Sequence, residues 1–152
     1  MSRRYLIGVD VGTQSAKVTV FDTDGGVVCC GKKALRKIEV PGPDVAIHPD
    51  DDVWDSLVGA FQKAMTEFHG LGLDARGILA IGVCVIRCCR VLMREDGELA
   101  YPVISWMDKR LNSAYQWQSD YGSVRWVTSA SGYITHRLTG EAKDTCANYI
   151  GC

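Results

Sequence analysis

The hydrophobic pattern at the start of the chain predicts two β-strands joined by a tight polar turn. Residues 6–11 and 17–21 are rich in apolar and β-branched side chains, a composition typical of strands. The turn between them, residues 12–15, reads Gly-Thr-Gln-Ser. A third strand is predicted at 27–31, after the turn sequence Thr-Asp-Gly-Gly. We therefore expect three consecutive antiparallel strands to begin the fold.

The pattern then alternates between helical and strand periods. Residues 34–49 are interrupted by Pro and Gly, which predicts an extended surface connection. A helix is expected over 51–69, introduced by an acidic run that can cap it and ended by Gly70. Its apolar positions recur at helical spacing: Trp54, Leu57, Val58, Phe61, Ala64, Met65 and Phe68. The apolar run 78–86 predicts a central strand covered on both faces, reached by a βαβ crossover.

The rest of the chain, residues 87–152, is expected to hold a hairpin and two helices. The hairpin strands are predicted at 90–93 and 100–105, with helices at 112–118 and 129–138, a loop at 120–123 and Gly140 as the second helix stop. The order of elements indicates an α/β fold with a mixed sheet and flanking helices.

Composition narrows the class of protein. The chain has 152 residues, 47% of them hydrophobic and 23% charged, with a net charge of −1 and no basic block. This balance argues against nucleic acid or an anionic membrane as the main partner. Asp10 interrupts the short apolar run after Arg3 and Arg4, so the N-terminus reads as a cytosolic strand rather than a signal peptide.

Cysteine usage favours a reducing compartment. The seven cysteines include no Cys-x-x-Cys pair, which makes a zinc site unlikely on spacing grounds. Most fall in apolar runs, where cysteines usually serve as small buried side chains. We interpret them as structural thiols of a cytoplasmic protein; they are Cys29, Cys30, Cys84, Cys88, Cys89, Cys146 and Cys152.

The first hairpin carries the clearest chemistry. Closely spaced backbone amides around Gly12, with hydroxyls and Lys17, can form a concave anion site. Asp10 at the end of the first strand can hold a divalent cation or its water shell beside a phosphate. The alternative is an ordinary hairpin in which Gly12 merely supplies a positive φ.

Three segments resemble one family in the expected order. Asp10-x-Gly-Thr-x-Ser-x-Lys17 resembles the first phosphate motif of the actin-like ATPase superfamily. Residues 97–110 (GELAYPVISWMDKR) and 133–141 (YITHRLTGE), the latter followed by Asp144 and Asn148, are similar to segments of the FGGY carbohydrate kinases. The resemblance covers nearly the whole chain. It implies a ribonuclease H-like (actin-like ATPase) domain with a mixed five-stranded-type sheet.

The resemblance also implies roles for individual residues. Asp10 would lie near Mg²⁺ and the transferred phosphoryl group of ATP. The hairpin around the phosphates would be Gly12, Thr13, Gln14, Ser15 and Lys17.

Four further residues would serve the sugar or polyol. Arg87 and Cys88 would grip substrate hydroxyls, and Trp106 would lie against the carbon backbone. Asp108 would bond hydroxyls or order the following helix. The simpler alternatives are a surface cation for Arg87, a core side chain for Trp106 and a helix cap for Asp108.

The chain also departs from the family pattern. Residues 85–89 (VIRCC) replace a polar stretch such as Gly-Gln-Met-His-Gly, which leaves the sugar undefined. Between the helix that follows residues 97–110 and the helix of residues 133–141, the family normally has a longer connection than the few residues near 119–124. A loop is therefore either missing from the sequence or deleted. The catalytic base, the second phosphate motif and the adenosine pocket of the family follow the matched region.

We therefore expect residues 1–152 to be an incomplete N-terminal domain of an ATP-dependent carbohydrate kinase, inactive alone. Its partner would be a small sugar or polyol, and the full-length enzyme could be a homodimer. Two alternatives stay open. One is a non-kinase actin-like module for nucleotide sensing or assembly, and the other is a structural fragment that binds nothing.

Overall fold

The computed structural model describes residues 3–149, which form two compact units. Unit 1 comprises residues 3–35 and 53–85, and unit 2 comprises residues 36–52 and 86–149. No helix in this described part of the chain is long and apolar enough to cross a membrane. Each unit is described by itself below.

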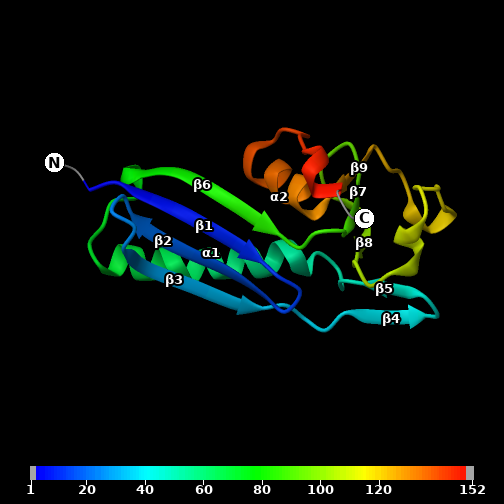
Figure 1. Ribbon diagram of the computed structural model, residues 1–152, viewed down its shortest axis with the longest axis horizontal. Coiled ribbons are helices and arrows are strands. Elements are labelled where there is room, and N and C mark those ends of the chain that lie inside the picture. Colours follow the sequence, from blue (N-terminus) through cyan, green and yellow to red (C-terminus); the bar gives the residue numbers. More distant parts are fainter. Residues whose placement is uncertain (1–2, 150–152) are drawn as a thin grey trace. The chain divides into compact units, whose positions relative to one another are not determined.

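Unit 1 is a four-stranded mixed sheet in the order β3-β2-β1-β6 (Figure 1). Strands β1 (Tyr5–Val11), β2 (Ser15–Asp22) and β3 (Val27–Ala34) are antiparallel neighbours, as predicted. Helix α1 (Asp52–Gly70) then leads to β6 (Ile78–Val85), which pairs in parallel with β1. The helix and the βαβ crossover predicted from the sequence are both confirmed.

The core of unit 1 lies between one face of the sheet and α1. Alternate side chains of β1 and β2 are buried, and the Tyr5 ring meets Phe68 of the helix edge-on with centroids 4.9 Å apart. The predicted helix positions Leu57, Ala64 and Phe68 are fully buried, together with Val53 and Ala60. The period-2 strands and the helical stripe therefore meet as their patterns require.

Gly31 on β3 brings the strand against the helix backbone. A Cβ at this position would lie 2.0 Å from the Ala60 carbonyl oxygen and 2.6 Å from the Ala64 nitrogen. The neighbouring Cys29 thiol donates to the Ala64 carbonyl at 3.3 Å. Only glycine permits this close approach of strand and helix.

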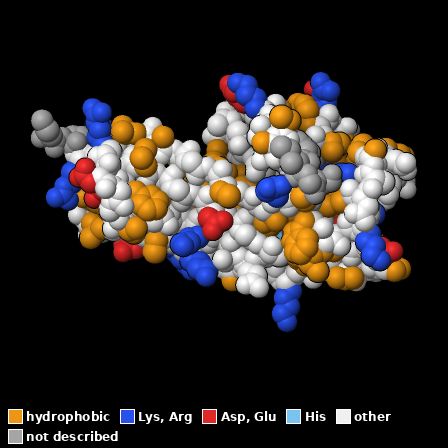
Figure 2. All heavy atoms as spheres, in the orientation of Figure 1, with side chains coloured by type: hydrophobic (Ala, Val, Ile, Leu, Met, Phe, Trp, Pro, Cys, Tyr) orange, Lys and Arg blue, Asp and Glu red, His pale blue; other side chains and the backbone are white. Residues whose placement is uncertain are grey.

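The prediction of a central, doubly covered strand at 78–86 is wrong for the described residues. β6 pairs only with β1 and lies at the sheet edge, with Leu79 54% and Ile81 44% exposed. Hydrophobic side chains accordingly reach the surface over this unit in Figure 2. A continuous apolar run predicts burial only where other elements cover both faces, and residues 3–149 supply one helix.

Unit 2 is an antiparallel sheet in the order β4-β5-β8-β7-β9 (Figure 1). Strands β7 (Arg90–Met93) and β8 (Leu99–Ile104) form the predicted second hairpin. Strand β9 (Trp126–Ser129), which the sequence analysis missed, leads directly into α2 (Ala130–Thr139). Ser129 caps α2 by accepting from the Gly132 N–H at 3.1 Å, and Gly140 ends it at φ 75°.

Two segments of unit 2 differ from prediction. Residues 34–49 are not a plain surface connection, because they form β4 (Glu39–Gly42) and β5 (Val45–Ile47) and bury Ala46, Ile47 and His48. Asp44 permits their tight turn at φ 68°. Residues 112–118 are not an α-helix; a 3-10 turn, Lys109–Asn112, gives way to irregular chain and a second such turn, Ser119–Tyr121. The side chains of residues 112–118 are mostly exposed, as Trp117 is, so the segment has no apolar stripe that a helix could bury.

The cysteines only partly fit the structural interpretation. Cys29 and Cys89 are buried, whereas Cys30, Cys84 and Cys146 are exposed. Cys88 is disulfide-bonded, so its interpretation as a free thiol is wrong. Cys152 lies outside the described residues. A 3-10 turn, Cys146–Tyr149, ends the described chain.

Candidate functional site

The hairpin between β1 and β2 gathers the residues predicted to bind phosphate. The Gly12 N–H donates to the Ser15 carbonyl at 3.0 Å and closes the turn. The Leu35 N–H donates to the Gln14 carbonyl at 3.0 Å, which ties the turn to the end of β3. Gly12 does not have a positive φ, so the alternative explanation for this glycine is wrong.

Asp10 and Lys17 are direct cross-strand partners beside this turn. Both are exposed, while their neighbours Val9, Val11, Ala16 and Val18 are buried on the helix side. A carboxylate and an ammonium group therefore stand together on the face of the sheet that α1 leaves open.

This donor set fits a phosphate with a magnesium ion. Hydroxyls of Thr13 and Ser15 and the Lys17 ammonium can face the anion, and Asp10 can contribute one oxygen to the cation. Within residues 3–149 no group of three or more His, Cys, Asp or Glu side chains could hold a metal alone. Magnesium needs no such group, because it is commonly bound by one carboxylate together with the phosphates of the substrate.

Unit 2 contains a pocket of about 600 Å³ beside Cys88. Its walls come from residues 88–90, the end of the turn Lys109–Asn112 and the chain after it, β9 and the C-terminal segment. Arg90 helps to fix one wall by donating to the Ser113 carbonyl at 3.0 Å. The lining residues are Cys88, Cys89, Arg90, Leu111, Asn112, Ser113, Ala114, Tyr115, Val127, Thr128 and Asn148. The volume and the mixture of polar groups with an aromatic ring suit a small polar ligand.

The predicted sugar-binding residues have unequal positions around this pocket. Cys88 lines it at φ 60°, whereas Arg87 is exposed and Trp106 is 50% exposed. Burial raises the pKa of the adjacent Cys89 thiol to about 11, and the Trp106 backbone N–H donating to its sulfur acts in the opposite direction. Trp106 is thus joined to the pocket wall through Cys89 and is not a core side chain.

Asp108 is a buried structural carboxylate, 2% exposed. It accepts from the Ala46 N–H at 2.8 Å, from the Arg110 N–H at 2.9 Å and from the Arg110 guanidinium at 2.7 and 2.9 Å. Burial would raise the pKa of Asp108, but these hydrogen bonds outweigh it and lower the value. They match the predicted capping role, since Asp108 begins the 3-10 turn Lys109–Asn112.

The block 133–141 builds the fold rather than the pocket. The buried Tyr133 hydroxyl donates to Asp51 at 2.6 Å, and Arg137 pairs with the same carboxylate at 3.1 Å. Burial and the Asp51 hydrogen bond both raise the pKa of Tyr133. Asp51 is therefore used to anchor α2 within unit 2.

Several pocket residues were missed by sequence reasoning. Arg90, Asn112, Ser113, Tyr115 and Thr128 come from separate segments with no motif spacing among them. Of the other lining residues, Cys88 was predicted, and Cys89 and Asn148 stood in segments already singled out.

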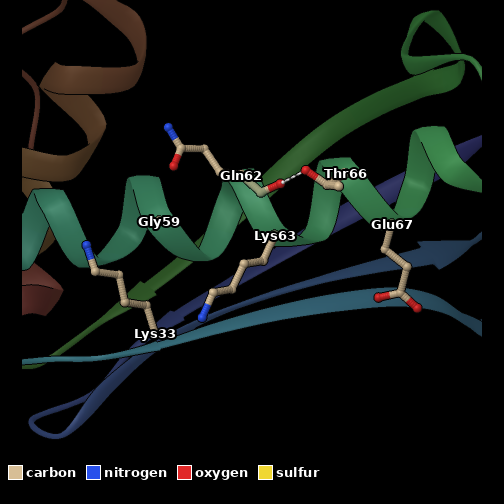
Figure 3. A pocket seen from close by; sticks show the side chains of 6 residues that line it. All are labelled: Lys33, Gly59, Gln62, Lys63, Thr66 and Glu67. Carbon is tan, nitrogen blue, oxygen red and sulfur yellow. Dashed lines mark hydrogen bonds between the residues drawn. The ribbon is translucent and has the colours of Figure 1, made fainter.

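A second hollow, in unit 1, holds none of the predicted site residues. Figure 3 shows Lys33, Gly59, Gln62, Lys63, Thr66 and Glu67 along this open groove between β3 and α1. The Lys33 ammonium donates to the Asp55 carbonyl and Lys63 to the Lys32 carbonyl, both at 3.0 Å. The lysines thus fasten strand to helix.

Comparison with known proteins defines the class. Residues 5–143 match the N-terminal domain of the FGGY family of carbohydrate kinases. The chain therefore belongs to this family.

Particular relatives agree with this assignment. The chain is 48% identical over 151 residues to "Uncharacterized sugar kinase YgcE" of Escherichia coli K12, covering 99% of this chain and 30% of that protein. It is 32% identical to a glycerol kinase of Chromobacterium violaceum, covering 72% and 21%. A xylulose kinase structure from Brucella ovis, titled "xyloylose kinase", superposes with a TM-score of 0.73 at 17% identity, covering 91% and 35%. The actin-like ATPase fold is thus confirmed, and the chain spans less than a third of its curated relatives' length.

Proposed function

We propose that this chain supplies one part of the active site of an ATP-dependent kinase for a small sugar or polyol. The observation that carries the proposal is the β1–β2 hairpin, where Asp10 and Lys17 stand side by side next to a Gly-Thr-Gln-Ser turn. Membership of the carbohydrate kinase family supports it. Bound ATP with magnesium would supply the transferable phosphoryl group.

The residues of unit 1 would position and neutralise the phosphates. Lys17 and the hydroxyls of Thr13 and Ser15 would donate hydrogen bonds, while the Gly12 turn keeps the backbone close to the anion. Asp10 would hold the cation. Phosphoryl transfer depends mainly on such positioning and charge neutralisation.

The residues of unit 2 would hold the sugar in the 600 Å³ pocket. Cys88, whose sulfur is disulfide-bonded, would form part of the pocket wall. Arg87 and Trp106 do not line this pocket, and they would contact hydroxyls and the carbon skeleton where the sugar reaches beyond it. Asp108 would keep its turn in place through Arg110 and Ala46. The acceptor hydroxyl would lose its proton to a base outside this chain. The chain alone is therefore expected to be inactive. We further expect the intact enzyme to be cytoplasmic and able to form a homodimer.

The test is a thermal-shift and phosphorylation screen of the full-length gene product with Mg·ATP and a panel of pentuloses, hexuloses and alditols. We expect one sugar to raise the melting temperature and to be phosphorylated. Asp10→Asn should abolish turnover, and Trp106→Ala should weaken the sugar-dependent shift while leaving the ATP-dependent shift intact. A shift with nucleotide alone, with no sugar phosphorylated, would instead support a nucleotide-sensing module.

A further inference from the structure

Asp144 is joined to two residues that line the unit 2 pocket without lining it itself. Its Oδ2 accepts from the Thr128 hydroxyl at 2.8 Å and from the Ser129 N–H at 2.9 Å. Its Oδ1 accepts from the Thr145 N–H at 2.8 Å and from the Asn148 side-chain amide. One carboxylate thus connects the end of β9 with the C-terminal segment.

Gly132 on α2 leaves the space that this connection needs. A Cβ at Gly132 would lie 2.1 Å from the Thr128 hydroxyl oxygen and 2.6 Å from Asp144 Oδ2. The hydrogen bond between the two residues therefore passes directly over the glycine. Ser129, the next residue on β9, caps α2 through Gly132 as well, so the helix start and the carboxylate fix the same stretch of chain.

This arrangement limits what the Thr128 hydroxyl can offer to a ligand. A hydroxyl has one proton, and Thr128 donates it to the Asp144 carboxylate oxygen. The Thr128 oxygen can then only accept a hydrogen bond from a ligand. Asn148 is likewise oriented, because its NH₂ group is directed to Asp144.

We propose that Asp144 is a positioning residue for the sugar. It holds Thr128 and Asn148 so that the pocket presents an acceptor oxygen at Thr128 to one hydroxyl of the substrate. The inference rests on the proposed function, since it assumes that this pocket takes the sugar.

The test compares Asp144→Asn, Thr128→Val and Thr128→Ser in the full-length enzyme, with the sugar that the wild type phosphorylates. Asp144→Asn replaces one acceptor oxygen with a donor, and Thr128→Val removes the hydroxyl while keeping the shape. Each should raise KM for the sugar about tenfold, the worth of one hydrogen bond. KM for ATP and kcat should stay within about twofold of wild type, because phosphate binding belongs to unit 1. Thr128→Ser, which keeps the hydroxyl, should behave as wild type.

Asp120→Asn is the matched control, since it makes the same chemical change on an exposed 3-10 turn and should leave all constants unchanged. A wild-type KM for the sugar in Asp144→Asn would overturn the inference while leaving the proposed kinase function standing. Equal losses for sugar and ATP, with no rescue by Thr128→Ser, would also overturn it, because they indicate a merely structural role. A wild type that phosphorylates no sugar would overturn the proposed function itself.

Discussion

Replacing Gly31 with alanine tests the packing of unit 1 directly. The added Cβ would come within 2.0 Å of the Ala60 carbonyl oxygen and 2.6 Å of the Ala64 nitrogen. Both atoms belong to the helix backbone, so no side-chain rotation relieves the contact. Helix α1 must instead move away from β3, which loosens the packing of the fully buried Ala60 and Ala64.

Overpacking of this kind costs about 1–3 kcal/mol of unfolding free energy. At about 2.1 cal/mol/K of unfolding entropy per residue, a 152-residue chain has about 0.3 kcal/mol/K, so the melting temperature should fall by about 3–9 °C. Differential scanning calorimetry of the purified chain measures the change, and urea titration checks it isothermally.

Gly70→Ala is the matched control, because nothing lies within 4 Å of a Cβ there and its φ is not positive. It lies at the end of the same helix and should leave stability unchanged or raise it by up to about 1 kcal/mol. If Gly31→Ala melted at the wild-type temperature, the close approach of β3 and α1 would be refuted.

Two further predictions concern the buried side chain of His48 and the exposed edge strand β6. His48 is fully buried, and neither ring nitrogen has a hydrogen-bond partner among the described residues. Burial lowers the pKa of His48, with Asp52 opposing it, so the unfolded state binds the proton more readily and stability should fall as pH drops below about 6.5. His48→Phe should flatten the urea midpoint between pH 7.5 and 5.5, whereas the exposed His69→Gln should not; equal pH slopes in wild type and His48→Phe would contradict this. The apolar edge strand β6 should pair between copies of the purified chain, and Leu79→Lys should reduce that self-association in sedimentation velocity, because a lysine on an edge strand opposes pairing. A concentration-independent monomer in the wild type would contradict it.

Local sequence determined those parts of the fold that were predicted well. The first hairpin follows from two period-2 runs around a short turn, and α1 and α2 follow from helical stripes with Gly70 and Gly140 as stops. Residues such as Asp10 and Lys17 could be placed together because their register depends only on that turn.

The parts that were missed depend on distant segments. Strand β6 was expected to be central because its apolar run carries no information on how many elements cover it. β5 became a strand by pairing with β8, and β9 by pairing with β7, partners far away in sequence. The unit 2 pocket is likewise assembled from separate segments, so neither Thr128 nor Tyr115 could be chosen in advance.

The division into units has a consequence for how this domain can be inherited and recombined. The chain passes between units three times, after residues 35, 52 and 85. A ribosome therefore releases β4 and β5 before α1, whereas β8, the partner of β5, follows only after β6 and β7. A gene fragment ending at residue 85 would carry β4 and β5 without β8, the other neighbour of β5, and one starting at 86 would lack Asp51, the anchor of Tyr133. Exchanging unit 2 between members of the family thus requires moving two separated gene segments together, so a single crossover would break its sheet.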